Sequence, residues 1–257
     1  MGSASRESLA AVAQQLGNTT EAGVAGELLQ AAGHMRSSRS LAAALAKPVA
    51  EQEKTDFVNG LFKTLSRNAR EILVAATVCR WSNTEELVSG VESLAVRAAA
   101  VNAQYLDEEL HAAAEVVDSS HGLELNLGSK LIAAPLKAQL AKKVFGEKVS
   151  DSALRIIAHF VAYPAGRKLS VALREAAHTA AFQNGYVLAE VAVASKLDET
   201  RAARLQEALS KIAEQPVKLQ TVIDPTLVGG VRVKLANEII DGSISARLAN
   251  LRLQLAG

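Results

Sequence analysis

The chain has 257 residues and a formal net charge of +1, which excludes the strongly basic surface of a typical nucleic-acid-binding protein and any bulk attraction to a membrane surface. Its single cysteine, Cys79, excludes an intramolecular disulfide framework and fits a reducing compartment. Hydrophobic residues make up 49% of the chain but aromatic residues only 4%, so small aliphatic side chains must fill the core, which favours closely packed helices over a β-sandwich.

Helical periodicity runs from about residue 4 to about residue 183. In the first helix Leu9 and Leu16 lie on one face, Gly17 and the asparagine after it end the helix, and Thr19 or Thr20 caps the next one. Further helices are predicted at 38–46, 48–65, 68–81 and 84–105. Together these segments predict a compact bundle of about six helices.

The N-terminal segment MGSASRESLAAVAQQLG lacks the long apolar core of a signal peptide. Gly2 is not followed by the serine or threonine that a myristoylation site needs at the sixth position, where Arg6 stands. The sequence also contains no run of about 18 apolar residues that would span a bilayer. We therefore expect the chain to meet a membrane only through a partner.

An internal repeat links two parts of the helical region. A shift of 83 residues places Lys54 on Lys137 and Phe62 on Phe145, within the segments 54–81 and 137–163. Apolar positions match better than charged ones, as expected when the packing of a helical unit has been duplicated. The alternative is that two alanine-rich amphipathic helix pairs align by chance.

The stretch 106–128, LDEELHAAAEVVDSSHGLELNLG, begins with a helical pattern and ends in turn signals, so we interpret it as a junction. The predicted organisation is a helical bundle at 1–105, the junction at 106–128, a second helical unit at 129–185 and a C-terminal domain at 186–257. The predicted fold class is mainly α: an N-terminal multi-helix bundle with an internal helical repeat, followed by a small α+β domain.

After Gly185 the apolar period changes from helical to alternating. The segments YVLAEVAVAS, VKLQTVI and VRVKL alternate and predict strands, and Asp198 caps a helix between the first two. The predicted order is strand, helix, strand, strand, helix. The last helix carries an apolar stripe from Ile244 to Leu255.

The segment 224–254 is rich in residues that act on the backbone. Asp224 and the proline after it end the second strand, because proline cannot donate to a ladder. Gly229 and Gly230 allow positive φ or a close backbone contact before the third strand. Ser243 is the preferred N-cap of the last helix, with Asp241 as the alternative. The segment thus specifies a shape, and the shape offers a surface rather than chemistry.

This ending resembles the delta subunit of the bacterial F-type ATP synthase, the counterpart of the mitochondrial oligomycin-sensitivity-conferring protein. The resemblance rests on a strand, a Gly-Gly break, a second strand, IDGS and an Arg-Leu pair, and its residues are Asp224, Gly229, Gly230, Asp241, Gly242, Ser243, Arg247 and Leu248. The helical first part, which runs into a strand near residue 186, extends the resemblance over the whole chain. The usual family member is shorter. The additional helical unit is similar to the enlarged delta subunit of actinobacteria, and we expect a free-standing subunit because no b-type segment is recognisable.

The resemblance implies a non-catalytic peripheral-stalk (stator) subunit at the cytoplasmic face of the bacterial plasma membrane. The bundle would take N-terminal helices of the ATP synthase α subunits in grooves between its helices, and the C-terminal domain would hold the end of a b-type stalk subunit. The subunit would keep the catalytic head from rotating with the central shaft during ATP synthesis coupled to proton transport. The alternative is a stand-alone helical adaptor that shares only the C-terminal domain.

The sequence predicts no catalytic, cofactor-binding or metal-binding site. The five histidines form no i, i+4 pair, and glycine-rich phosphate motifs are absent. His159 and Cys79 lie in apolar helices, which predicts packed side chains. Trp81 and Tyr163 lie near matching helix ends, where we expect core packing; the alternative is an exposed anchor for a partner helix.

Overall fold

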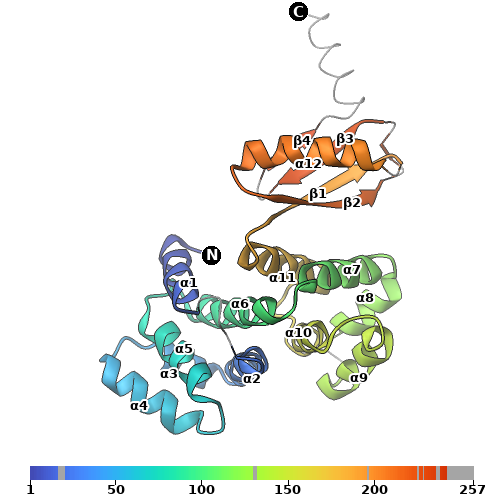
Figure 1. Ribbon diagram of the computed structural model, residues 1–257. Helices are drawn as coiled ribbons and strands as arrows, with labels where there is room; N and C mark the ends of the chain where they lie inside the picture. The colour runs from blue at the N-terminus through green and yellow to red at the C-terminus, as the bar shows by residue number, and fades with distance from the viewer. Residues whose placement is uncertain are drawn as a thin grey trace, which may run out of the picture. The chain divides into compact units, whose positions relative to one another are not determined.

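Figure 1 shows the computed structural model, which describes residues 1–16, 21–129, 132–195, 197–224, 226–227, 229–235 and 238–241. The chain divides into two compact units, Met1–Gln183 and Asn184–Gly257. The first unit is helical, and the second combines one described helix with a small sheet. The predicted fold class, mainly α with a small α+β part, is confirmed.

Eleven helices form the first unit within its described residues. In chain order they are α1 (Ser3–Leu16), α2 (Val24–Ser37), α3 (Arg39–Ala46), α4 (Glu51–Leu61), α5 (Arg67–Val78), α6 (Thr84–Asn102), α7 (Leu106–Asp118), α8 (His121–Gly128), α9 (Ala134–Phe145), α10 (Asp151–Ala162) and α11 (Leu169–Gln183). The predicted stop at Gly17 and the caps at Thr19 or Thr20 lie outside the described residues. Side chains that do cap helices, each by accepting from the backbone N–H three residues on, are Ser38, Ser66, Asn83, Ser120 and Ser150.

Three helices are shorter than the sequence predicts, and one of them is α6, which ends at Asn102 instead of residue 105. Helix α4 ends at Leu61 because Phe62 leaves the helical region, with φ −105° and ψ 42°. Helix α5 ends at Val78 because Cys79 is extended, with ψ 157°. Trp81 therefore lies beyond the helix, where its indole N–H donates to the Ala76 carbonyl at 2.7 Å. Phe62 and Leu65, which follow α4, are buried, so the apolar period continues past the end of that helix.

The first unit contains one five-helix arrangement twice, as α2–α6 and as α7–α11. The same pairs pack together in both: α2 lies along α6, and α7 lies along α11. A shared polar contact marks the repeat. The backbone N–H and hydroxyl of Ser66 donate to Glu27, and those of Ser150 donate to Glu109. Each serine caps the fourth helix of its copy and each glutamate lies on the first, so the sequence repeat corresponds to a duplicated structure.

The second copy begins earlier than the sequence repeat suggested. Residues 106–128, interpreted above as a junction, form α7 and α8, the first two helices of that copy. Ser120, which reads as a turn signal, is the N-cap of α8, and Gly122 and Gly128 lie inside the helix. We therefore define the first copy as residues 24–102 and the second copy as residues 106–183.

Matching positions of the two copies fill matching places in the core. The pairs of buried residues are Leu28 and Leu110, Leu45 and Leu127, Phe62 and Phe145, Leu73 and Ile157, Val91 and Leu173, and Ala98 and Ala180. The first copy is additionally covered by α1, which packs against α5 and α6 through Val12 and Leu16. Alanines along α6 and α11 let the paired helices approach closely.

The duplicated cap predicts equal effects in the two copies. Ser66→Ala and Ser150→Ala should each lower the free energy of unfolding by about 1–2 kcal/mol, since each removes an N-cap and one donor to a glutamate. Urea denaturation followed by circular dichroism measures the change. Ser119→Ala is the control: the Ser119 hydroxyl donates only to the Val116 carbonyl in an exposed turn, so the change should stay within about 0.5 kcal/mol. A loss at Ser66 alone would contradict the equivalence of the copies.

The second unit is a four-stranded sheet with a helix on one face. Its elements are β1 (Val187–Val193), α12 (Glu199–Ala213), β2 (Val217–Ile223), β3 (Val231–Leu235) and β4 (Glu238–Asp241), and the strand order is β2-β1-β3-β4. Strand β1 is parallel to β2 and antiparallel to β3, which is antiparallel to β4. Helix α12 makes the crossover that a parallel pair requires. The three predicted strands are confirmed, and β4 is a fourth strand that the predicted order of strand, helix, strand, strand, helix did not include.

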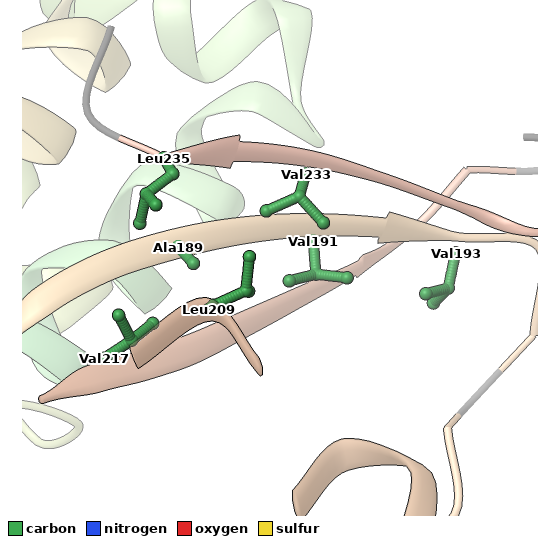
Figure 2. Close-up of a cluster of buried hydrophobic side chains, with 7 residues drawn as sticks. All are labelled: Ala189, Val191, Val193, Leu209, Val217, Val233 and Leu235. Atoms are coloured by element: carbon green, nitrogen blue, oxygen red, sulfur yellow. The ribbon is translucent and has the colours of Figure 1, made fainter. Parts of the chain in front are cut away.

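Alternation along the strands builds the core of this unit. Figure 2 shows the inward side chains meeting Leu209 of α12; they are Ala189, Val191, Val193, Val217, Val233 and Leu235. Asp198 caps α12 as predicted, accepting from the Arg201 backbone N–H at 2.7 Å. The predicted final helix lies outside the described residues.

Candidate partner surfaces and the joint between the helical copies

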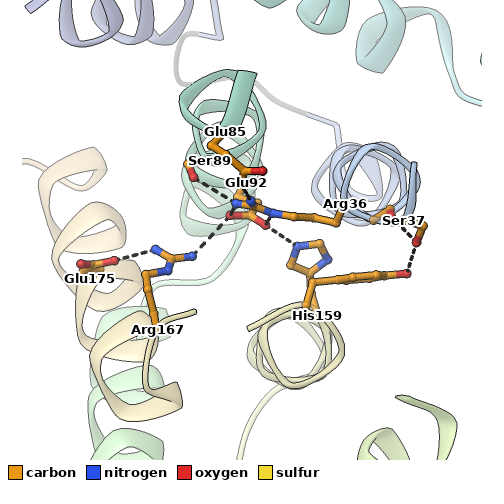
Figure 3. A network of polar contacts seen from close by, with 10 residues as sticks. Arg36, Ser37, Glu85, Ser89, Glu92, His159, Arg167 and Glu175 are labelled. Atoms are coloured by element: carbon orange, nitrogen blue, oxygen red, sulfur yellow. Dashed lines mark hydrogen bonds and ion pairs between the residues drawn. The ribbon is translucent and has the colours of Figure 1, made fainter. Parts of the chain in front are cut away.

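A buried carboxylate lies where the two helical copies meet. Glu92 projects from the middle of α6, and its side chain is 3% exposed. Figure 3 shows Arg36 of α2 reaching it from one direction and His159 of α10 from another. Arg167, in the turn between α10 and α11, completes the group. We call Arg36, Glu92, His159 and Arg167 the joint cluster.

The contacts within the joint cluster are specific. Arg36 binds the carboxylate at two points: Nε donates to Oε1 and Nη2 donates to Oε2, each at 2.9 Å. His159 Nε2 lies 3.0 Å from Oε1, and Arg167 Nη2 lies 3.5 Å from Oε2. A guanidinium fork matches a carboxylate in this way, which makes the contact directional. One carboxylate therefore binds groups from both copies.

Outer partners hold the two arginines of the joint cluster. Arg36 also donates to Glu85 and to the Ser89 hydroxyl of α6. Arg167 Nη1 donates to Glu175 of α11 at 2.7 Å, and the Arg167 guanidinium stands 5.6 Å from the centre of the Phe160 ring. Each arginine is therefore held at several points, and its planar guanidinium loses little side-chain freedom for each hydrogen bond that it forms.

Burial and hydrogen bonding act in opposite directions on the charge of Glu92. Burial alone would raise the pKa of this carboxyl, but hydrogen bonds from His159 and Arg36 and the charge of Arg36 outweigh it, so the pKa of Glu92 lies below its ordinary value. Burial would likewise lower the pKa of Arg36, but its contacts with Glu92 and Glu85 raise it. Both partners are therefore charged at neutral pH.

The lowered pKa of Glu92 predicts an acid-dependent loss of stability. The contribution should be fully present above the ordinary glutamate pKa of about 4.3 and should disappear as the pH falls through the lower pKa of the folded state. Urea denaturation at a series of pH values measures it. In Glu92→Gln the curve should be flatter in this acid range; an unchanged slope in that variant would assign the acid sensitivity to other carboxylates.

The second copy carries the same ion pair with the signs exchanged. A shift of 82 residues takes Arg36 to Asp118 and Glu92 to Arg174, and Arg174 Nη2 lies 2.6 Å from Asp118 Oδ2. The pair in the second copy is more exposed: the side chain of Arg174 is 25% exposed and that of Asp118 is 39% exposed. In the first copy the side chains of Arg36 and Glu92 are 8% and 3% exposed. Only the first copy's pair is covered, because the second copy packs over it.

Two glycines of α2 receive side chains from α10 and from Tyr163, the residue that follows it. A Cβ at Gly33 would lie 3.0 Å from the Tyr163 ring, and one at Gly26 would lie 3.0 Å from an Arg155 nitrogen. The same shift of 82 residues takes Gly26 to Glu108 and Gly33 to Glu115, so the second copy has glutamates where the first copy has glycines. The contact between the copies is therefore asymmetric.

Open grooves within the described residues lie beside the joint cluster. One of about 750 Å³ runs between α2 and α10 and is lined by Gly26, Gln30, Gly33, Arg155 and Tyr163, among others. Another, of about 440 Å³, lies between α1, α6 and α11, with Leu9, Val96, Arg97 and Ala172 in its lining. Open grooves between helices that combine apolar and charged walls suit the side chains of an amphipathic partner helix.

The structure settles several expectations about single residues. His159 is buried, as predicted, and Trp81 and Tyr163 pack against Gly90 and Gly33. Burial raises the pKa of the Cys79 thiol, as expected for a packed rather than a reactive cysteine. Glu92 was not predicted as a functional residue from the sequence. The signal that marks it is a glutamate on the apolar face of an alanine-rich helix.

The family-motif residues lie partly within the described part of the chain. Asp224 follows β2 and accepts from the Thr226 backbone N–H at 2.9 Å and from its hydroxyl at 2.6 Å, contacts that lower the pKa of Asp224. Gly229 and Gly230 precede β3, and Gly230 has a φ of 82°. Asp241 ends β4. Gly242, Ser243, Arg247 and Leu248 lie outside the described residues, and a partner role for the motif stays a prediction.

The described residues include no group of three or more histidine, cysteine, aspartate or glutamate side chains arranged to hold a metal ion. Of the helices within the described ranges, none is both long and apolar enough to cross a bilayer.

Known proteins match the chain along its length. The family model of the ATP synthase delta (OSCP) subunit matches residues 92–255. ATP synthase subunit delta of Leifsonia xyli subsp. xyli is 37% identical to this chain, with 100% of both chains covered. The chain belongs to the ATP synthase delta (OSCP) subunit family. ATP synthase subunit delta of Streptomyces coelicolor is 30% identical and covers 100% of this delta-family chain and 98% of its own length.

The full-length matches decide between the two hypotheses drawn from the sequence. An adaptor sharing only the C-terminal domain would match these relatives over the last part of the chain, yet the matches include both helical copies. They also confirm the predicted similarity to the enlarged delta subunit of actinobacteria. A further relative, ATP synthase subunit b-delta of Mycobacterium sp., is 30% identical over 74% of this delta-family chain and 44% of its own length.

Proposed function

We propose that this chain ties the catalytic head of an F-type ATP synthase to the b-type stalk helices and so prevents the head from rotating with the central shaft. Membership of the delta (OSCP) family makes the chain a structural subunit of the peripheral stalk. The observation that carries the proposal is the match to ATP synthase subunit delta over 100% of both chains. The chain itself performs no catalysis in this proposal and needs no cofactor.

The helical unit is the proposed contact with the head. N-terminal helices of the α subunits would dock in its interhelical grooves, of which those along α2–α10 and α1–α6–α11 are candidates. The joint cluster supports this role because it fixes the two helical copies against one another. A stator transmits torque only if the parts between head and stalk do not yield.

The α+β unit is the proposed contact with the b-type subunit. The relative named ATP synthase subunit b-delta supports this contact, since its name joins the two subunits in one chain. The motif residues Asp224, Gly229, Gly230 and Asp241 would shape that surface. Contacts at both ends raise the effective concentration of each partner for the other, which slows dissociation. The complex would then hold the chain at the cytoplasmic face of the plasma membrane.

Reconstitution tests the proposal. Membranes prepared without this subunit should release the catalytic head and lose ATP synthesis. Addition of the full chain should restore retention of the head and ATP synthesis. The two readouts are sedimentation of the head with the membranes and ATP synthesis driven by an imposed proton gradient. Titration calorimetry with an N-terminal peptide of the α subunit then tests the head contact directly. Head retention and synthesis that do not depend on the chain would refute the proposal.

A further inference from the structure

Equivalent helices of the two copies leave apolar side chains exposed. On α4 of the first copy, Phe57 is 44% exposed and Leu61 is 46% exposed. The matching helix of the second copy is α9, where Leu136 is 59% exposed and Leu140 and Val144 are half-buried. In both helices these residues are spaced by four, so they lie along one side. A buried lysine, Lys54 or Lys137, lies beside this exposed edge in each copy, three residues before Phe57 or Leu140.

The charged residues beside the exposed apolar residues differ in sign between α4 and α9. We define the α4 face as Glu53, Asp56, Phe57, Gly60 and Leu61, and the α9 face, a shift of 83 residues away, as Leu136, Gln139, Leu140, Lys143 and Val144. The α4 face carries two carboxylates and no lysine or arginine. The α9 face carries one lysine and no carboxylate. The α4 residues that make up this face are all exposed.

Gly60 adds an independent observation. A Cβ built at this position meets nothing within 4 Å, so no packing within the described part of the chain requires a glycine. A glycine inside a helix nevertheless destabilises it relative to alanine. A glycine beside two exposed apolar residues lets the backbone of a partner helix come close, and the second copy has Lys143 in its place.

We infer that the α4 face is a docking surface for a basic amphipathic helix of another polypeptide. Phe57 and Leu61 would enter the apolar stripe of that helix, Gly60 would allow close approach, and Glu53 and Asp56 would pair with its lysines or arginines. Lys143 at the matching position keeps the same helix off the α9 face, so the duplicated unit discriminates between its two similar surfaces by charge. This goes beyond the proposed function, which places partner helices in grooves between helices and assigns neither the α4 face nor a charge to any of them.

Titration calorimetry of the full chain with two designed peptides tests the inference. Both peptides have about 15 residues, a length at which helices become stable, and the same leucine stripe. One has lysines on its polar side and the other has glutamates. The lysine peptide should bind the chain more tightly than the glutamate peptide, and the difference should shrink at high salt.

Four variants locate the binding. Phe57→Ser should weaken binding of the lysine peptide about tenfold or more, because a central apolar anchor is lost. The double variant Glu53→Lys/Asp56→Lys should reverse the preference in favour of the glutamate peptide. Leu136→Ser on the α9 face and Val171→Ser on α11 are matched exposed controls and should leave binding unchanged.

Three results would overturn the inference. The first is equal binding of the lysine peptide by the parent chain and by Phe57→Ser, with both folded by circular dichroism. The second is a preference of the parent chain for the glutamate peptide. The third is no binding of either peptide by the folded chain. None of them bears on retention of the catalytic head by membranes, so the inference and the proposed function fail independently.

Discussion

Replacing Glu92 by glutamine is expected to lower the free energy of unfolding of the helical unit by about 3–5 kcal/mol. The substitution keeps the shape of the side chain but removes its charge, which leaves the buried Arg36 with one carboxylate partner, Glu85, instead of two, and gives the buried His159 a neutral partner. Urea denaturation at neutral pH measures the change. Circular dichroism reports all helices, whereas fluorescence of the single tryptophan, Trp81, reports the first copy.

The matched controls for Glu92→Gln use the same kind of contact at exposed positions. Glu85→Gln removes the second carboxylate that pairs with Arg36, and the Glu85 side chain is 74% exposed. Asp118→Asn removes the acidic partner of Arg174 in the sign-exchanged pair of the second copy. Each should cost at most about 1 kcal/mol because water screens these pairs. If Glu92→Gln costs no more than these controls, the joint cluster is not what holds the two copies together.

A second large effect is expected from Gly90→Ala. A Cβ at this position in α6 would lie 2.1 Å from the Trp81 ring, so the ring must move. The indole is held by its hydrogen bond to the Ala76 carbonyl and is rigid, so the displacement should lower the free energy of unfolding by about 1–3 kcal/mol. The tryptophan fluorescence spectrum of the folded variant should shift as well, since the ring changes its surroundings.

Two further variants separate this steric effect from the helix preference of alanine. Gly60→Ala changes a helical glycine whose Cβ would meet nothing, and should raise stability by about 0.5–1 kcal/mol. In the background of Trp81→Ala, Gly90→Ala should no longer destabilise the protein. A persistent loss in that double variant would show that contacts other than the Trp81 ring require the glycine.

Together these experiments address how a small-residue helical unit becomes stiff. Alanine-rich helices pack closely but offer few shape-specific contacts. The joint cluster adds directional contacts between copies, and Gly33 and Gly90 each receive one aromatic ring. Such contacts define a single arrangement of the two copies, which a torque-resisting stalk subunit needs.

Local sequence determined the elements of this protein and their faces. Helical and alternating apolar periods placed most helices and the three strands, because each element must bury one face whatever it packs against. Short polar residues such as Asp198 marked helix starts, since an orphan backbone N–H is satisfied within three residues. The apolar positions of the repeat were visible because a duplicated core keeps its volume while its surface charges change.

Tertiary structure decided what these elements do together. The start of the second copy at Leu106 depends on α7 packing along α11, a contact between segments far apart in the chain. Glu92 became the centre of a cluster only when Arg36, His159 and Arg167 arrived from three other segments. Its charge is stable there because those donors offset the cost of burial, and that balance depends on distances between side chains, which no local pattern of residues contains.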